Sequence, residues 1–302
     1  MQFLQFLKNN ALPLAILLGC VFWQWTHLLS WILPYNLFIM LFLSFSRVSV
    51  SELKFKKVHL LLLLVLIIGG LGSYLIISPF NKILAESVMV VVMCPTATAA
   101  VVVTTKLGGS APNVVSFTLL VNLVMALLIP TVFPLIENND KSFIDGFLAI
   151  LQKVFPMLVC PMVLSELLRK ITPKFHSNIQ KISSLSFYLW AFSIIVLMGR
   201  TTKDILDKPE NVYIDILMAI SSLIVCILLY IIGKKIGTKF DDRVSCGQNV
   251  GQKNTIFAIW VAQTYLNPLS ALGSSFYIVW QNLFNSWQLQ KKRKHEEKKS
   301  ND

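Results

Sequence analysis

The sequence predicts an all-α polytopic membrane protein, and two observations support this class. Hydrophobic residues make up 55% of the 302 residues, charged residues make up 14%, and the mean hydropathy is +0.66, a composition unlike that of soluble globular domains. Apolar stretches of roughly 17 to 25 residues recur along the whole chain, which is the length that a helix needs to cross a hydrocarbon core about 30 Å thick. We therefore expect a multi-pass protein of the cell inner membrane, with the lipid bilayer as its surroundings.

Ten membrane spans result when the apolar stretches are divided at polar or charged clusters. The first stretch follows Lys8 and has the outline of a signal peptide, but it lacks a clear small-residue cleavage site and another span follows directly. We therefore expect it to be retained. The predicted spans are 11 to 26, 29 to 45, 58 to 77, 83 to 105, 112 to 136, 146 to 168, 182 to 199, 212 to 233, 244 to 265 and 268 to 288.

The distribution of positive charge predicts the orientation of these spans. An even number of spans places both termini on one side of the membrane. With the N-terminus in the cytoplasm, 20 of the 27 lysine and arginine residues fall in cytoplasmic segments and 6 on the other side, the remaining one being Lys253. This asymmetry predicts two cytoplasmic termini and explains the net charge of +12 without a nucleic-acid partner. The basic tail, 289–302, is expected to be disordered and attracted to anionic lipid headgroups.

The ten spans divide into two sets of five, 1–138 and 139–288. An odd number of spans per set means that the second set is inverted relative to the first, which is a common plan in transporters. The fourth span of each set has an interrupted pattern, "VVVMCPTATAAVVVTTKLGG" in one case and "SCGQNVGQKNTIFAIWVAQ" in the other. A proline and an Asn-Leu pair follow each of them, at Pro112 and Asn122 in the first set and at Pro268 and Asn282 in the second.

Helices that break inside a membrane create binding sites. Their unpaired backbone groups persist only where protein or a watery cavity surrounds them, and the half-helix ends carry partial charges that attract ions. For each polar residue near the breaks a purely structural role is the alternative: a kink for Pro95, hydroxyl bonds within one helix for the threonines, and interhelical bonds for the amides. The candidate substrate- and ion-binding residues are Thr96, Thr98, Thr118, Asn122, Asn249, Lys253, Asn254, Gln281 and Asn282.

Lys253 is the most informative of these residues. An ionised lysine at the centre of a membrane helix costs roughly 2.5 to 3.5 kcal/mol on insertion scales. Snorkelling to the membrane surface is the alternative, but at least nine residues separate Lys253 from either end of its apolar region, and its neighbours are polar. We therefore expect its ammonium group to act inside the membrane.

Several segments taken in order resemble the bile acid:sodium symporter superfamily of secondary transporters. "CPTATAAVVVTTKLGGSAP" resembles the family's fourth-span crossover, "FPMLVCPMVLSELLRK" its sixth span, and "NVGQKNTIFAIWVAQ" with "SSFYIVWQNL" its ninth and tenth spans. The resemblance covers essentially the whole chain. It implies a core domain of spans 3 to 5 and 8 to 10 with crossing fourth and ninth helices, a panel domain of spans 1, 2, 6 and 7, and a substrate cleft between them.

The departures from this family concern its sodium sites. The family's Pro-Gly-Gly and Ser-Asn elements are replaced by Pro95-Thr96-Ala97 and Ala100-Val101, whereas its sodium-site threonine is matched by Thr118. In the ninth span the family glutamate aligns with Asn249 and the glutamine with Lys253, followed by the family asparagine at Asn254.

These replacements remove one acid and add one base, which opposes sodium binding. We therefore predict that the ammonium group of Lys253 occupies the place of a bound sodium ion and that no cofactor or metal is required. Two further interpretations stay open. Burial disfavours the charged amine, which would permit proton coupling, or the ammonium group pairs with an anionic substrate.

We predict a secondary transporter of a small organic anion, such as a bile-acid-like or carboxylate solute, that works by alternating access. An arsenite or metalloid efflux permease is the alternative within transport, because Cys94 lies at the crossover and thiolates bind arsenite. The five cysteines have no close Cys or His partners and indicate neither a metal site nor disulfides. A membrane-embedded enzyme is disfavoured, because Asp241-Asp242 is a single acidic pair and the common catalytic motifs are missing. A non-transporting receptor is the remaining class.

Overall fold

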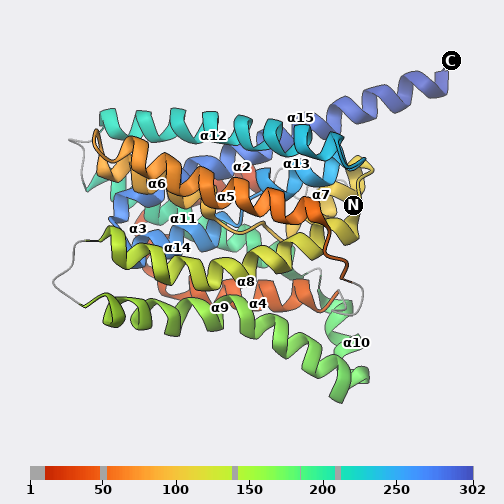
Figure 1. The fold of residues 1–302 in the computed structure, drawn as a ribbon, viewed down its shortest axis with the longest axis horizontal. Coiled ribbons are helices and arrows are strands. Elements are labelled where there is room, and N and C mark those ends of the chain that lie inside the picture. Colours follow the sequence, from red (N-terminus) through yellow and green to blue (C-terminus); the bar gives the residue numbers. More distant parts are fainter. Residues whose placement is uncertain (1–10, 48–52, 138–141, 184, 208–211, 302) are drawn as a thin grey trace.

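The computed structural model describes residues 11–47, 53–137, 142–183, 185–207 and 212–301, and these residues form helices and short connections without a β-strand (Figure 1). Six helices are long and apolar enough to cross a membrane: Trp23–Phe45, Lys57–Ile77, Ala111–Ile136, Phe143–Ile171, Leu185–Leu206 and Val212–Thr238. The predicted all-α membrane class is therefore confirmed. The elements are α2 (Ala11–Val21), α3 (Trp23–Thr26), η1 (His27–Ile32), α4 (Leu33–Phe45), α5 (Lys57–Ile77), α6 (Lys82–Met93), α7 (Ala99–Leu107), α8 (Ala111–Ile136), α9 (Phe143–Ile171), α10 (Pro173–Ile182), α11 (Leu185–Leu206), α12 (Val212–Thr238), α13 (Arg243–Gly251), α14 (Thr255–Tyr265), η4 (Pro268–Ser270) and α15 (Ala271–Asn301).

The first segment of the chain reverses direction on the surface of α11. Gly19 of α2 lies against Ile195 and Met198, whereas Asn36 of α4 donates through its side chain to the carbonyl of Leu189 at 2.9 Å. Between these contacts the helix tightens into the 3₁₀ segment η1. The stretch from α3 to α4 is long and apolar enough for one span, but these contacts make α2 and α4 separate arms.

Capping residues fix the ends of the helices that surround the site. The side chain of Asn81 accepts a hydrogen bond from the backbone N–H of Leu84 at 2.9 Å and starts α6. Gly108, with φ of 83°, ends α7 in the left-handed conformation that glycine adopts without strain. Ser110 then caps α8 by accepting from the N–H of Asn113 at 3.3 Å. The turn between α7 and α8 is therefore set by local sequence.

Both interruptions predicted from the sequence are present. Helix α6 ends at Met93 and α7 begins at Ala99, while α13 ends at Gly251 and α14 begins at Thr255. In each case a long helix precedes the broken pair and another follows it: α5 and α8 flank the first pair, and α12 and α15 flank the second. Small residues allow close packing beside the second break, because Gly251 faces the ring of Tyr230 on α12.

Helices that are distant in sequence gather into two groups. Helices α5 to α8 pack with α12 to α15, whereas α2 to α4 pack with α9 to α11. The two groups meet where α8 contacts α9 and where α14 and α15 touch α4 and α11. The sequence boundary expected between the two five-span sets, at 138 and 139, lies outside the described residues.

The C-terminal tail differs from the prediction. Residues 289–302 were expected to be disordered, but α15 continues as a helix to Asn301 and extends away from the other helices (Figure 1). Lys292 and Glu296 form an ion pair at 3.4 Å one helical turn apart, and Lys292 also donates to the carbonyl of Lys106 at 3.0 Å. Such i,i+4 pairs of opposite charge stabilise a solvated helix. The overall basic composition of the tail does not reveal this pairing.

Candidate functional site

The two helix breaks pair with each other at the centre of the larger helix group. Thr96 and Lys253 form an antiparallel β-bridge. The N–H of Ala97 donates to the carbonyl of Gln252 at 2.9 Å, and the N–H of Asn254 donates to the carbonyl of Pro95 at 2.8 Å. Each broken segment therefore supplies partners for the backbone groups that the other leaves unpaired, which is how an interrupted helix persists in a membrane.

The side chain of Lys253 closes the end of the first half-helix. Its residue is 1% exposed, and its Nζ donates to the carbonyl of Val92 at 2.7 Å and to that of Cys94 at 3.0 Å. These carbonyls belong to the last turn of α6, where the helix dipole is negative and the helix provides no further N–H partners. The amine of Lys253 thus lies where a half-helix end attracts a cation. The side chain does not snorkel to the surface.

Three other predicted residues hold the crossover in place. The Oε1 of Gln281 accepts from the backbone N–H of Lys253 at 2.8 Å, which links α15 to the break. The hydroxyl of Thr96, fully buried, donates to the carbonyl of Asn249 at 2.5 Å. Asn254 caps α14 by accepting from the N–H of Phe257 at 3.3 Å. All three bind backbone groups of the protein and link the two broken segments to each other and to α15.

Asn249 directs its side chain into a second buried network. Its Nδ2 donates to Oδ1 of Asn113 at 3.0 Å, and the same oxygen lies 2.9 Å from Nε2 of His59. The Nδ2 of Asn113 donates to Asp242 at 2.8 Å. This network joins the starts of α5, α8 and α13, while the Oδ1 of Asn249 is left without a hydrogen-bond partner. Asp242, half of the acidic pair considered for a metal-dependent enzyme, thus caps α13 and belongs to this network.

Three predicted residues make only local bonds. Thr118 donates to the carbonyl of Val114 at 2.8 Å, Asn122 to that of Thr118 at 2.6 Å, and Asn282 to that of Ile278 at 2.7 Å. Each bond returns to the preceding turn of the same helix, which is the structural alternative expected for Thr118, whereas interhelical bonds were the alternative expected for Asn122 and Asn282. Asn122 retains an unpartnered buried Oδ1.

A cavity of about 80 Å³ lies where α4 meets α7 and α8, between the two helix groups. Thr98, at the start of the half-helix α7, and Thr118 both line it. The exposed Arg47 and the partly buried Ser44 also line it. The other lining residues are Phe45, Val101, Val102 and Val115. The cavity thus combines positive charge, hydroxyl groups and an apolar wall.

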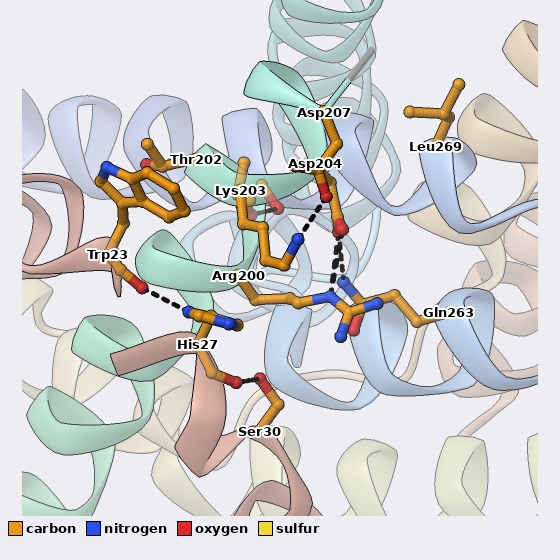
Figure 2. Close-up of polar contacts among 12 residues, drawn as sticks. Trp23, His27, Ser30, Arg200, Thr202, Lys203, Asp204, Asp207, Gln263 and Leu269 are labelled. Carbon is orange, nitrogen blue, oxygen red and sulfur yellow. Dashed lines mark hydrogen bonds and ion pairs between the residues drawn. The ribbon is translucent and has the colours of Figure 1, made fainter. Parts of the chain in front are cut away.

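At the opposite end, polar contacts tie the two helix groups together (Figure 2). Asp204 of α11 pairs with Arg200 at 3.1 Å and accepts from the side-chain Nε2 of Gln263 on α14 at 3.3 Å. Nearby, the hydroxyls of Thr201 on α11 and Ser275 on α15 lie 2.9 Å apart. Polar side chains therefore bridge the boundary between the groups at this end, whereas the cavity lined by Thr98 and Thr118 lies at another part of the same boundary.

Cys94 does not line this cavity. Its residue is 2% exposed and its thiol donates to the carbonyl of Asn254 at 2.9 Å. Among the described residues, no three His, Cys, Asp or Glu side chains form a group that could hold a metal ion.

Comparison with protein-family models and with curated proteins gave no match to this chain.

Sequence reasoning missed two residues that the structure makes prominent. Arg47 was counted only as one of the basic residues that set orientation, because its distance from Thr98 and Thr118 in sequence gives no sign of a shared cavity. Glu86 was overlooked within the span predicted at 83 to 105, although it is the only acidic residue in that span. A lone carboxylate in an apolar stretch is itself a signal of function.

Proposed function

We propose that the chain is a secondary transporter of a small organic anion that works by alternating access. The observation that carries this proposal is the pairing of two broken helices around a buried ammonium group, next to a cavity between two helix groups. Broken helices at this position are the feature by which many secondary transporters build their substrate and ion sites.

The arrangement of the broken helices supports an inverted repeat of ten spans. The order of long helix, broken pair and long helix occurs twice, in α5 to α8 and in α12 to α15. The breaks pair in antiparallel fashion, as two segments of opposite orientation would. With α2, α4, α9 and α11 as the remaining spans, an even total places both termini in the cytoplasm, as the positive charge distribution favours.

The two helix groups correspond to the core and panel domains that the resemblance to bile acid:sodium symporters implies. Helices α5 to α8 and α12 to α15 form the core, and α2 to α4 with α9 to α11 form the panel. Movement of the core against the panel would break the Asp204–Gln263 and Thr201–Ser275 contacts at one end and enclose the cavity at the other. The structure then corresponds to a state that is closed at the end where Asp204 meets Gln263.

The charges of the cavity favour an anionic substrate. The guanidinium group of Arg47 and the N-terminal end of α7 at Thr98 both attract negative charge, and the hydroxyl of Ser44 offers a donor. The apolar wall suits a hydrocarbon portion of the same solute. Lys253 supplies the positive charge that a bound sodium ion would supply in a coupled relative, so transport proceeds without sodium.

Ligand screening tests this function. Purified protein is heated with individual carboxylates, steroid acids and arsenite, because a bound ligand raises the apparent Tm by mass action. We expect an organic anion to stabilise the protein. Arg47→Gln removes a charged hydrogen-bond donor worth about 1.5 to 3 kcal/mol, so affinity for that anion falls roughly 10- to 100-fold.

Lys54→Gln is the matched control, because Lys54 is exposed on the segment that follows α4 and does not line the cavity. Stabilisation by arsenite alone, or equal losses of affinity in the two variants, would contradict the proposed substrate class. Flux of the identified anion into liposomes without a sodium gradient then completes the test.

A further inference from the structure

Glu86 is a buried carboxylate inside the same half-helix whose end Lys253 closes. Its residue is 1% exposed, and among the described residues it is the only aspartate or glutamate that is buried. An ionisable side chain held within a membrane segment is costly and is retained mainly where it has a function, proton transfer being a frequent one. The sequence and the transport model both leave this residue without a role.

The carboxylate of Glu86 has few partners. Its Oε2 accepts one hydrogen bond from the backbone N–H of Asn267 at 3.2 Å, and its Oε1 lies 3.9 Å from Nζ of Lys82. An ionised carboxylate offers about four acceptor positions, so its charged form is incompletely satisfied here. The Lys82 side chain is 49% exposed and reaches the surface beside Oε1, which gives protons a short route to the acid.

The surrounding helices provide little positive charge to keep Glu86 ionised. Tyr74 on α5 and Glu137 at the end of α8 lie near enough to interact electrostatically with Glu86. Lys82 is therefore the one cation that pairs with Glu86 among the described residues, and that cation is largely solvated.

We infer that Glu86 binds the coupling proton of the proposed transporter, while Lys253 remains a fixed cation. The inference rests on the proposed transport function. Loss of a proton from Lys253 would leave the carbonyls of Val92 and Cys94 with a poorer donor, whereas gain of a proton by Glu86 removes an incompletely paired charge. Glu86 on α6 and Lys253 at the crossover thus have separate roles.

The position of Glu86 links proton binding to the contact between the helix groups. Asn267, whose N–H it holds, follows α14 directly, and Gln263 near the end of α14 reaches Asp204 on α11 (Figure 2). A neutral acid accepts a weaker hydrogen bond than a carboxylate does. Protonation therefore loosens the Asn267 segment, next to the contact that must open for the core to move.

Infrared spectroscopy tests proton binding without any substrate. Difference spectra of the full-length protein in lipid are recorded between about pH 5 and pH 8, the range in which functional carboxylates often change protonation state. A buried acid that gains a proton within this range produces the band of a protonated carboxyl group. We expect this band in the wild type and its loss in Glu86→Gln. Glu137→Gln, which neutralises a partly exposed acid at the same end, should retain it. A band that persists in Glu86→Gln, or that the wild type lacks, overturns the proposal.

A transport assay tests coupling. Radiolabelled taurocholate and pantothenate serve as anionic probes, with exchange at equal pH and accumulation under a pH gradient measured in the same liposomes. We expect Glu86→Gln to keep exchange and lose the response to the gradient, and Glu86→Asp to recover part of it. A gradient response that survives in Glu86→Gln refutes the coupling role. If neither taurocholate nor pantothenate exchanges in the wild type, the result counts against the proposed transport function. The infrared result still decides whether Glu86 binds a proton.

Discussion

Replacement of Lys253 by methionine tests whether its ammonium group is a built-in cation. The change keeps an unbranched side chain of similar length and removes the donor that serves Val92 and Cys94. A hydrogen bond to a charged group contributes roughly 1.5 to 3 kcal/mol, so the two bonds together contribute about 3 to 6 kcal/mol. Against this loss, a lysine at the centre of a membrane helix costs about 2.5 to 3.5 kcal/mol, which methionine avoids.

The difference ranges from about 0.5 kcal/mol of stabilisation to about 3.5 kcal/mol of destabilisation for Lys253→Met, which is smaller than the total stability of about 5 to 15 kcal/mol typical of folded proteins. The variant is therefore expected to fold, with a Tm lower by a few degrees, and to lose transport. Size-exclusion chromatography and a thermal melt measure folding, and solute exchange in liposomes measures function. Full transport activity in the folded variant would refute the assignment of a functional cation.

A double variant gives the complementary result. Asn249→Glu with Lys253→Gln restores the residue types found at these positions in sodium-coupled members of the family that the sequence resembles. We expect sodium chloride to raise the Tm of this variant more than potassium chloride does, and to have no such selective effect on the wild type. Selective stabilisation of the wild type by sodium would show that a sodium site coexists with Lys253, contrary to the proposal.

Three further predictions address motion, packing and substrate. A disulfide between Thr201→Cys and Ser275→Cys, whose hydroxyls lie 2.9 Å apart, should abolish transport when oxidised and release it on reduction; unchanged transport in the cross-linked protein would argue against core movement. Gly233→Ala places a methyl group 2.5 Å from Val250 and against the backbone of Cys246, and such overpacking costs about 1 to 3 kcal/mol of stability. Gly72→Ala, whose methyl group meets no atom within 4 Å, should instead stabilise its helix. Thermal melts of the two variants measure both effects. Cys94→Ser should leave growth on arsenite unchanged, because the thiol is buried, and a loss of resistance would revive the metalloid alternative.

The sequence by itself determined the class of this protein and the location of its central feature. Transfer of apolar residues into a hydrocarbon core is a local property, so hydropathy alone predicted an all-α membrane protein. Proline, glycine and polar residues within two apolar stretches disfavour continuous helix in the same local way, which predicted the breaks near Pro95 and Lys253. The position of Lys253 within its apolar stretch also predicted that its amine acts inside the membrane.

Only the tertiary structure decided which groups meet. The carbonyls of Val92 and Cys94 lie about 160 positions before Lys253 in the chain, and no local preference connects them. The same holds for the cavity that joins Arg47 to Thr98, and for Asn249, which turned toward Asn113 and away from the crossover. Hydrophobic free energy fixes how much of each helix is buried, whereas the pairing of polar side chains depends on how all the helices pack together.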